Sequence, residues 1–182
     1  MKKVVLLGDS IRLIGYGTVL PELVKDKLEI WQPEDNSRFV QFVLRELFDF
    51  AEEIDQADIV HFNSGEWDIC NLYGDGTFTD AQYYTSQIVR IAEILQKKGK
   101  TVVFATTTPV KPGNPYNSNA DIEHFNRLAV EALKPMGVVI NDLYAVVMQD
   151  LANNIREDDK LHLSEAGIRA CAEATAQVLC KL

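Results

Sequence analysis

Three residues near opposite ends of the chain have the side chains needed for an activated nucleophile. Ser10 closes the segment Gly8-Asp9-Ser10, and Asp159 stands three residues before His162 near the other end. A serine hydroxyl becomes a good nucleophile when a base accepts its proton and a carboxylate holds that base in one tautomer. The chemistry open to this set is acyl transfer, with Ser10 as nucleophile, His162 as base and Asp159 as the orienting acid.

The residues before Ser10 predict a strand that presents it. Residues 4–7 are a continuous apolar run, which is typical of a buried parallel strand. Open α/β sheets bind their ligands at the carboxyl ends of such strands. We therefore expect Ser10 to lie exposed at the edge of a sheet, in a loop that covers residues 11–17.

The rest of the chain alternates strand and helix patterns without a linker or an internal repeat. Further strands are expected at residues 28–31, 58–63, 101–105 and 137–141, and helices at about 19–28, 39–50, 80–98, 121–135, 142–153 and from 164 to the end. This alternation predicts one domain over residues 1–182, a flavodoxin-like three-layer α/β/α fold with a five-stranded parallel sheet in the order 2-1-3-4-5. In that order the first and third strands are neighbours, so the loop at residues 63–68 faces Ser10.

The other candidates for the catalytic roles are weaker by position. His61 falls inside a predicted strand and His124 on a predicted helix, so both are interpreted as structural. Asp158 is a neighbour that could replace Asp159. Asp9 is expected to fix the loop through hydrogen bonds to backbone N–H groups.

These segments carry a family resemblance. Gly8-Asp9-Ser10 resembles the first conserved block of the SGNH (GDSL) hydrolases, and Asp159-x-x-His162 resembles the last block, which supplies acid and base. The stretch Asn63-Ser64-Gly65-Glu66-Trp67-Asp68 is similar to the third block, Gly-x-Asn-Asp, with Trp67 in place of the asparagine. The resemblance implies a parallel α/β sheet and ester hydrolysis through a Ser-His-Asp triad.

The departures from the family concern the donors that stabilise the oxyanion. The family uses a glycine N–H of its second block, but residues 36–38 of this chain contain no glycine. We expect the Ser10 N–H to serve, with the Asn63 amide as the favoured replacement for the missing asparagine and Asn36 as the alternative. Gly65 permits a tight turn or a close backbone approach.

Two further residues are assigned to the site without a settled role. Trp67 has an indole N–H that can donate a hydrogen bond. Arg12, close behind the nucleophile, has two possible functions: binding a substrate carboxylate or pairing with an acidic side chain.

Composition narrows the classes of partner. The net charge is -9 and no run of lysine or arginine occurs, so neither nucleic acid nor an anionic membrane is an expected partner. Three cysteines fit neither a disulfide framework nor a zinc site, and no cofactor or metal is expected. No secretory h-region or run of about 20 apolar residues is present, which predicts a cytoplasmic protein.

The sequence therefore predicts a serine esterase that cleaves small acyl esters, and the resemblance adds O-acetyl groups on carbohydrate as a substrate class. One alternative is a degenerate, non-catalytic domain of the same fold that binds a small ligand in the same crevice, because Trp67 replaces the expected asparagine. A second is a flavodoxin-like domain that binds a nucleotide or flavin, although no Gly-rich phosphate loop is found.

Overall fold

A single parallel sheet runs through the protein, whose computed structural model describes residues 1–182. Its strand order is β2-β1-β3-β4-β5, as predicted. The strands are β1 (Lys2–Leu7), β2 (Leu28–Trp31), β3 (Ile59–Asn63), β4 (Thr101–Ala105) and β5 (Val139–Asn141). All four pairings are parallel, which requires a crossover between successive strands.

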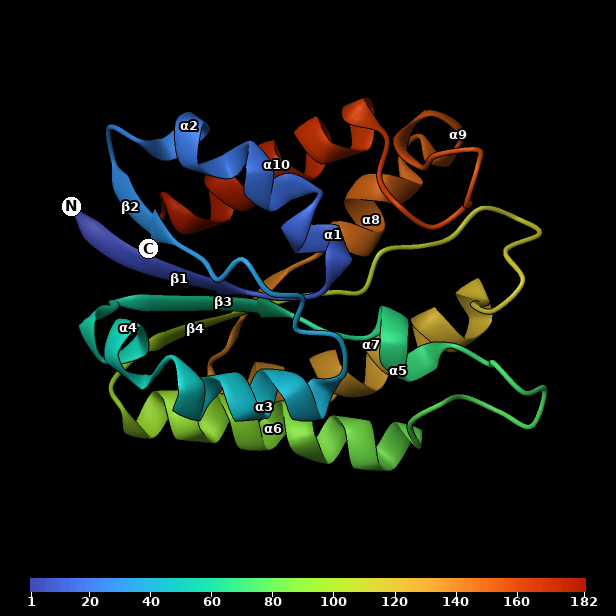
Figure 1. Cartoon of the computed structure of the whole chain (residues 1–182). Helices are drawn as coiled ribbons and strands as arrows, with labels where there is room; N and C mark the ends of the chain where they lie inside the picture. Colours follow the sequence, from blue (N-terminus) through green and yellow to red (C-terminus); the bar gives the residue numbers. More distant parts are fainter.

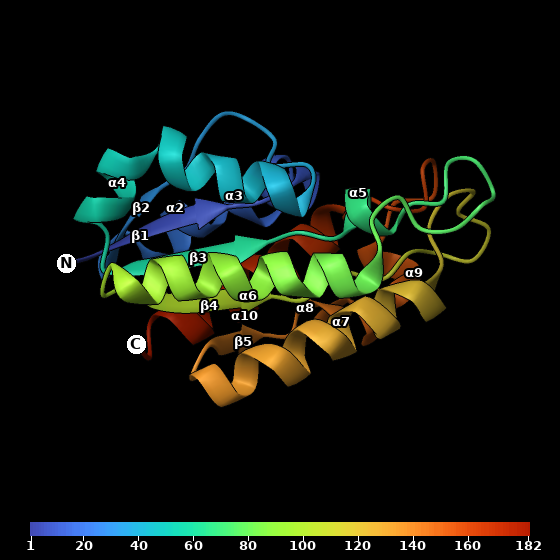
Figure 2. The same ribbon diagram turned by 90° about the horizontal axis from the view of Figure 1, so that it is seen from below.

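The helices form a layer on each face of the sheet (Figure 1 and Figure 2). They are α1 (Ser10–Leu13), η1 (Tyr16–Thr18), α2 (Leu20–Val24), α3 (Val40–Asp49), α4 (Ala51–Gln56), α5 (Glu66–Ile69), α6 (Ala81–Lys97), α7 (Asn119–Leu133), η2 (Lys134–Met136), α8 (Leu143–Met148), α9 (Leu151–Asn154) and α10 (Glu165–Leu179). Helices α3, α6 and α7 cover one face, while α2, α8 and α10 cover the other. The three-layer prediction is confirmed.

Strand β1 contributes alternate side chains to two hydrophobic cores, one on each face of the sheet. Val5 and Leu7 point into the core under α3 and α6, whereas Val4 and Leu6 point into the core under α2 and α10. All four are at most 1% exposed. Burying such a side chain contributes roughly 1.5–3 kcal/mol, so an apolar run is favoured in a strand that is covered on both faces.

The segment after β1 differs from the prediction. Residues 11–17 do not form a loop: Ser10 begins α1, and the Asp9 side chain caps this helix by accepting from the Ile11 N–H at 3.0 Å. A second short helix, η1, follows, and α2 is only five residues long. Two glycines and a tyrosine in this segment suggested a loop, but a side-chain cap is sufficient to start a single helical turn here.

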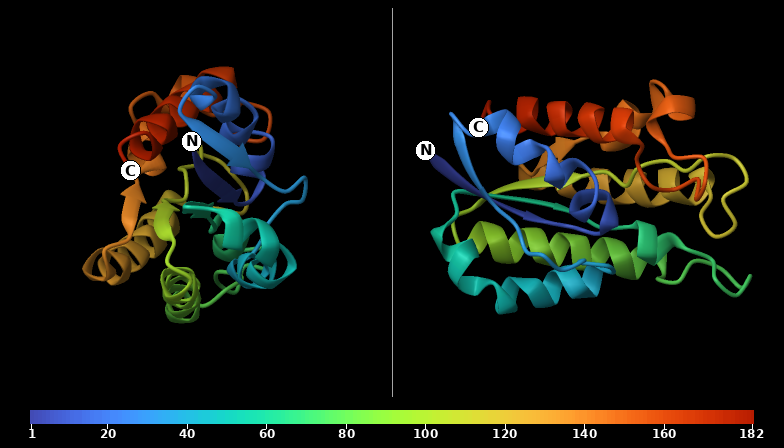
Figure 3. Two further views of the ribbon diagram at one scale, coloured as in Figure 1. Left: turned by 90° about the vertical axis from the view of Figure 1, so that its left-hand side faces the viewer. Right: turned by 45° about the horizontal axis from the view of Figure 1, so that its top comes forward.

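The carboxyl ends of the strands gather at one end of the molecule, away from both termini (Figure 3). The loops after β1, β3 and β4 and the segment before α10 all lie at this end (Figure 1). The register pairs Leu7 with Phe62 and Phe62 with Phe104, so these three strands end at similar levels. None of the helices has both the length and the apolar character that crossing a membrane requires.

Candidate active site

Ser10 lies where the sequence placed it, at the carboxyl end of β1, although on the first turn of α1 rather than in a loop. Its backbone N–H is one of the first N–H groups of a helix and has no partner within the protein. Ser10 is half-buried rather than exposed as expected. Ser10 therefore offers both a hydroxyl and a free backbone donor at the edge of the sheet.

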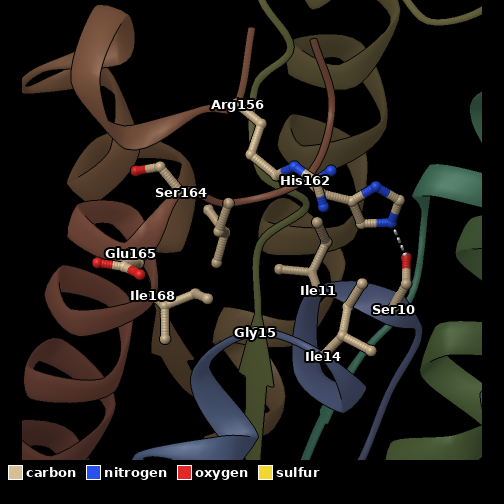
Figure 4. Close-up of a pocket in the computed structure, with 10 residues that line it drawn as sticks. Ser10, Ile11, Ile14, Gly15, Arg156, His162, Ser164, Glu165 and Ile168 are labelled. Atoms are coloured by element: carbon tan, nitrogen blue, oxygen red, sulfur yellow. Dashed lines mark hydrogen bonds between the residues drawn. The ribbon is translucent and has the colours of Figure 1, made fainter. Parts of the chain in front are cut away.

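A continuous chain of hydrogen bonds links the three predicted residues. His162 Nε2 lies 2.8 Å from Ser10 Oγ, and His162 Nδ1 lies 2.9 Å from Asp159 Oδ2 (Figure 4 shows the first of these contacts). This is the geometry in which a histidine can accept the serine proton while a carboxylate holds its other nitrogen.

Asp159 remains ionised because the loop supplies donors to it. Its Oδ1 accepts the N–H groups of Leu161 and His162 at 3.0 and 2.9 Å. Partial desolvation acts to raise the Asp159 pKa, but these bonds and the contact with the His162 ring outweigh it and lower the pKa to about 2. Asp158 is turned away and pairs with Arg156, so it does not compete for this position.

The segment that carries His162 is fixed at both sides. Ile155 and Leu163 form an isolated antiparallel bridge, and the Arg156 N–H donates to the His162 carbonyl at 2.9 Å. Ser164 then caps α10 by accepting from the Gly167 N–H, as expected. The histidine therefore lies in a loop that is held by hydrogen bonds within its own backbone and that leads directly into the last helix.

Asn63 contradicts the expectation for its side chain. It is 4% exposed and lies beneath the Ser10 turn, where its Nδ2 donates to Asp9 Oδ1 at 2.8 Å and its Oδ1 accepts from the Tyr16 hydroxyl at 2.9 Å. Asn63 does not line the space above Ser10. Its amide is occupied at both ends because Asp9 and Tyr16 are buried next to it and need partners.

Arg12 also has a different role from either of those assigned to it. The side chain is fully buried, and its guanidinium donates to the carbonyl oxygens of Gly8, Pro33 and Asp35. It reaches no substrate space and forms no ion pair. Arg12 instead joins the turn before Ser10 to the loop after β2.

The loop after β2 brings Asn36 to the site. Ser37 Oγ accepts the Gly8 N–H at 2.8 Å, which ties this loop to the end of β1. Asn36 Oδ1 accepts the Arg38 N–H at 2.8 Å, while Asn36 Nδ2 has no partner within the protein. Asn36 and Ser10 line the same cavity. Asn36 is thus the amide donor available beside the nucleophile.

Arg38 occupies the conformation that a glycine would favour. Its φ is 42°, which is uncommon for a residue with a Cβ. The loop after β2 therefore contains a non-glycine residue in left-handed backbone. The Arg38 N–H donates to Asn36 Oδ1, and this bond holds the Asn36 amide in place at the site.

Gly65 and Trp67 stand in the turn after β3. Gly65 has φ 151°, and a Cβ there would lie 2.0 Å from Thr107 Oγ1, so the close approach requires glycine. Gly65 does not line the cavity. Trp67 does line it, 38% exposed, with its ring edge-on to Phe39.

Two cavities meet at the Ser10–His162 pair. One, of about 380 Å³, lies toward β3 and α5, and we call it the amide cavity; its lining includes Asn36, Glu66, Trp67, Tyr116 and Asn117. The other, of about 390 Å³, is a groove between α1 and α10, and we call it the aliphatic groove (Figure 4); its lining includes Ile11, Ile14, Leu163 and Ile168, with Arg156 and Glu165 also present. A substrate bound across Ser10 would contact both.

The remaining histidines are structural, as interpreted from their positions. His61 is fully buried within β3 and its Nε2 lies 3.1 Å from Asn141 Nδ2, while burial lowers its pKa to about 3. His124 Nδ1 lies 3.0 Å from Arg127 on α7. The chain has no group of three or more His, Cys, Asp or Glu side chains arranged to hold a metal ion.

The fold is that of the GDSL hydrolases, as comparison with solved structures shows. The acetyl xylan esterase AlAXEase superposes with a TM-score of 0.80 at 22% identity over 96% of this chain and 98% of its own. A lipase/acylhydrolase from Enterococcus faecalis gives 0.80 at 20% identity over 100% and 96%. A member of the lipolytic G-D-S-L family from Veillonella parvula gives 0.77 at 16% identity over 99% of both chains.

No family model and no curated protein sequence matches this chain. The three structural neighbours named above are described as an acetyl xylan esterase, a lipase/acylhydrolase and a lipolytic protein. At these identities the likeness establishes the fold, and the roles of individual residues rest on the site itself.

Sequence reasoning missed the polar wall of the amide cavity. Glu66 occupies the variable position of the third block, so its residue type gave no signal. Asn117 lies in the long loop after β4, and Thr108 precedes it. Their hydrogen bonds to Glu66 depend on the packing of two loops that are far apart in sequence, which no local pattern reveals.

Proposed function

We propose that the protein is a serine esterase that cleaves small acyl esters with Ser10 as nucleophile, His162 as general base and Asp159 as the orienting acid. The observation that carries the proposal is the unbroken chain of contacts from Asp159 Oδ2 through the imidazole to Ser10 Oγ. The esterases and acylhydrolases among the structural neighbours support the same reaction class.

The first half-reaction follows from this arrangement. His162 Nε2 accepts the Ser10 hydroxyl proton while Oγ attacks the ester carbonyl, and the carbonyl oxygen becomes an oxyanion. The free Ser10 N–H and Asn36 Nδ2 are the donors that stabilise it. The intermediate then collapses, the bond to the alcohol oxygen breaks, and His162 returns the proton to that oxygen.

Water completes the cycle. His162 takes a proton from a water molecule, the resulting hydroxide attacks the acyl-enzyme carbonyl, and collapse of the second oxyanion breaks the bond to Ser10 Oγ. His162 then gives the proton back to Ser10, and a carboxylic acid leaves. Asp159, with its lowered pKa, stabilises the imidazolium that forms in both halves.

The substrate class in this proposal is small acyl esters, including O-acetyl groups on carbohydrate. Two observations support it: structural neighbours that are acetyl xylan esterases, and an amide cavity that combines aromatic and polar side chains beside Ser10. A cytoplasmic site of action, without nucleic acid or membrane as partner, belongs to the same proposal and agrees with three unpaired cysteines and the net charge of -9.

A panel of p-nitrophenyl esters, from acetate to octanoate, tests the proposal with wild-type protein, Ser10→Ala and the matched control Ser86→Ala, an exposed serine on α6. We expect Ser10→Ala to lower kcat by at least about 10³-fold with unchanged circular dichroism, and Ser86→Ala to behave as wild type. Equal, negligible turnover by all three proteins would favour the non-catalytic binding domain, for which Trp67 at the asparagine position is the motive.

A further inference from the structure

The amide cavity contains a buried carboxyl that the proposed reaction does not use. Glu66 is 4% exposed and lines the cavity together with Ser10. Its Oε1 lies 3.2 Å from the Thr108 hydroxyl, and its Oε2 accepts from Asn117 Nδ2 at 2.8 Å. These partners are neutral, and no cationic side chain pairs with the carboxyl, which is unusual for a buried charge.

An uncharged acid fits these surroundings better than a carboxylate does. Burial raises the pKa of Glu66 to about 8, the Asp9 carboxyl adds to the increase, and the bonds from Thr108 and Asn117 oppose it. Glu66 is therefore largely protonated at neutral pH. In this state it places no negative charge in the cavity where the oxyanion forms at Ser10.

The backbone carbonyl and the side chain of Glu66 together fix the orientation of the Asn117 amide. Asn117 Nδ2 donates to Glu66 twice, to the backbone carbonyl at 3.0 Å and to Oε2 at 2.8 Å. A backbone carbonyl only accepts, so the nitrogen must lie on that side. The other end, Oδ1, has no partner within the protein, and Asn117 lines the cavity. An oriented hydrogen-bond acceptor is thus left for a ligand.

We propose that Asn117, held in place by Glu66, recognises a hydroxyl group on the alcohol part of the ester. The inference rests on the proposed esterase function and narrows its substrate to esters of polyhydroxy alcohols. Because Asn117 Oδ1 is an acceptor, its ligand must donate a hydrogen bond. A simple acyl chain has no donor, whereas a second hydroxyl group on the alcohol is one. The aliphatic groove, lined by Ile11, Ile14 and Ile168, is the better match for an acyl chain.

The test compares two acetates that share a three-carbon alcohol skeleton, glycerol 1-monoacetate and propyl acetate, by pH-stat titration of released acetic acid. We expect wild-type kcat/KM to favour the hydroxylated ester. Asn117→Ala should lower that preference about five-fold or more, in line with the loss of one hydrogen bond to a buried group. Turnover of p-nitrophenyl acetate, which has no hydroxyl on its alcohol part, should fall by a smaller factor than turnover of glycerol 1-monoacetate.

A more conservative substitution, Asn117→Ser, can be measured if Asn117→Ala does not fold. Asn117→Ser keeps a donor for Glu66 but presents no carbonyl to the cavity, so it should also lose the preference.

The positioning role of Glu66 is tested separately. Glu66→Gln retains an acceptor for Asn117 without a charge and should keep the preference. Glu66→Ala leaves the Asn117 amide only its bond to the backbone carbonyl of this residue, so it should weaken the preference. Asn153→Ala, an exposed asparagine on α9, is the matched control.

Several results would overturn the inference while the proposed function stands. These are equal wild-type kcat/KM for the two acetates, an unchanged preference in folded Asn117→Ala or Asn117→Ser, or an equal loss of all three activities in these variants. A preference that is unchanged in Glu66→Ala would remove Glu66 from the account. If wild type hydrolyses none of the esters, the proposed function fails, and the inference fails with it.

Discussion

His162 Nε2 and Ser10 Oγ lie 2.8 Å apart although 152 positions separate the two residues in the chain. Ser10 is held by the end of β1, and His162 by the segment before α10. The two meet because α10 packs against η1 and α2, which follow Ser10 directly. A contact at this distance between a potential nucleophile and a potential base is the observation on which the functional proposal depends.

The oxyanion assignment predicts a kinetic effect for Asn36. Removing one oxyanion donor typically lowers turnover about 10²–10³-fold. Asn36→Ala should therefore lower kcat by that factor with little change in KM, because the bond strengthens only in the transition state. Asn36→Asp keeps the acceptor for the Arg38 N–H and loses the donor, so it should be no better. Full kcat in both variants would remove Asn36 from the oxyanion site.

The two adjacent aspartates provide a matched pair. Asp159→Asn should lower kcat about 10⁴-fold, since an amide cannot stabilise the imidazolium and favours the wrong tautomer of His162. Asp158→Asn, which loses only a surface pair with Arg156, should retain turnover within about two-fold. Steady-state kinetics on p-nitrophenyl acetate measures both. The opposite ranking would transfer the acidic role to Asp158.

Arg12 is predicted to affect stability through backbone carbonyls. Arg12→Lys cannot reach Gly8, Pro33 and Asp35 together, and unpaired buried carbonyls are costly, so we expect a loss of about 2–4 kcal/mol in unfolding free energy. Arg45→Lys, which changes an exposed arginine paired with Asp49 on α3, should leave the urea midpoint nearly unchanged. Urea titration measures both; equal effects would contradict the assignment.

Glu46 predicts a pH dependence of stability. It is 1% exposed, and neither carboxyl oxygen has a hydrogen-bond partner. Burial raises its pKa from 4.5 to about 7, and the nearby Ser37 hydroxyl and Arg12 guanidinium offset this only in part. The folded state therefore holds the proton more tightly than the unfolded state, so stability is lost as pH rises from about 4.5 through about 7.

Glu46→Gln removes that titration. Relative to wild type, the variant should gain up to about 3 kcal/mol in unfolding free energy between pH 4.5 and pH 8. Urea denaturation across this range measures the difference between the two proteins. A difference that does not depend on pH would mean that Glu46 titrates alike in the folded and unfolded chains.

The sheet could be predicted from sequence because its signals are local. Residues 4–7 and 101–105 are short apolar or β-branched runs, and helical patterns between the strands require parallel pairing. The Ser10, Asp159 and His162 positions followed from residue type and from their place at predicted strand ends and loops.

The donors around Ser10 could not be predicted in the same way. Asn63 ends a predicted strand and Asn36 follows another. From the sequence alone, Asn63 was the favoured oxyanion donor. Its amide is instead bonded to Asp9 and Tyr16, which lie far apart from it in sequence. Asn36 is available because the neighbouring Arg38 takes a positive φ that its residue type does not suggest. Such side-chain directions are decided by tertiary packing.

If Ser10 is an activated nucleophile, as proposed, an electrophilic phosphonate should react with it and remain attached. Wild-type protein, Ser10→Ala and His162→Ala would be incubated with a fluorophosphonate, and intact mass and peptide mapping would be recorded. We expect one phosphonyl group per wild-type chain, located on Ser10, with none on Ser10→Ala and much slower labelling of His162→Ala. An unlabelled wild-type protein, or an adduct on another residue, would contradict it.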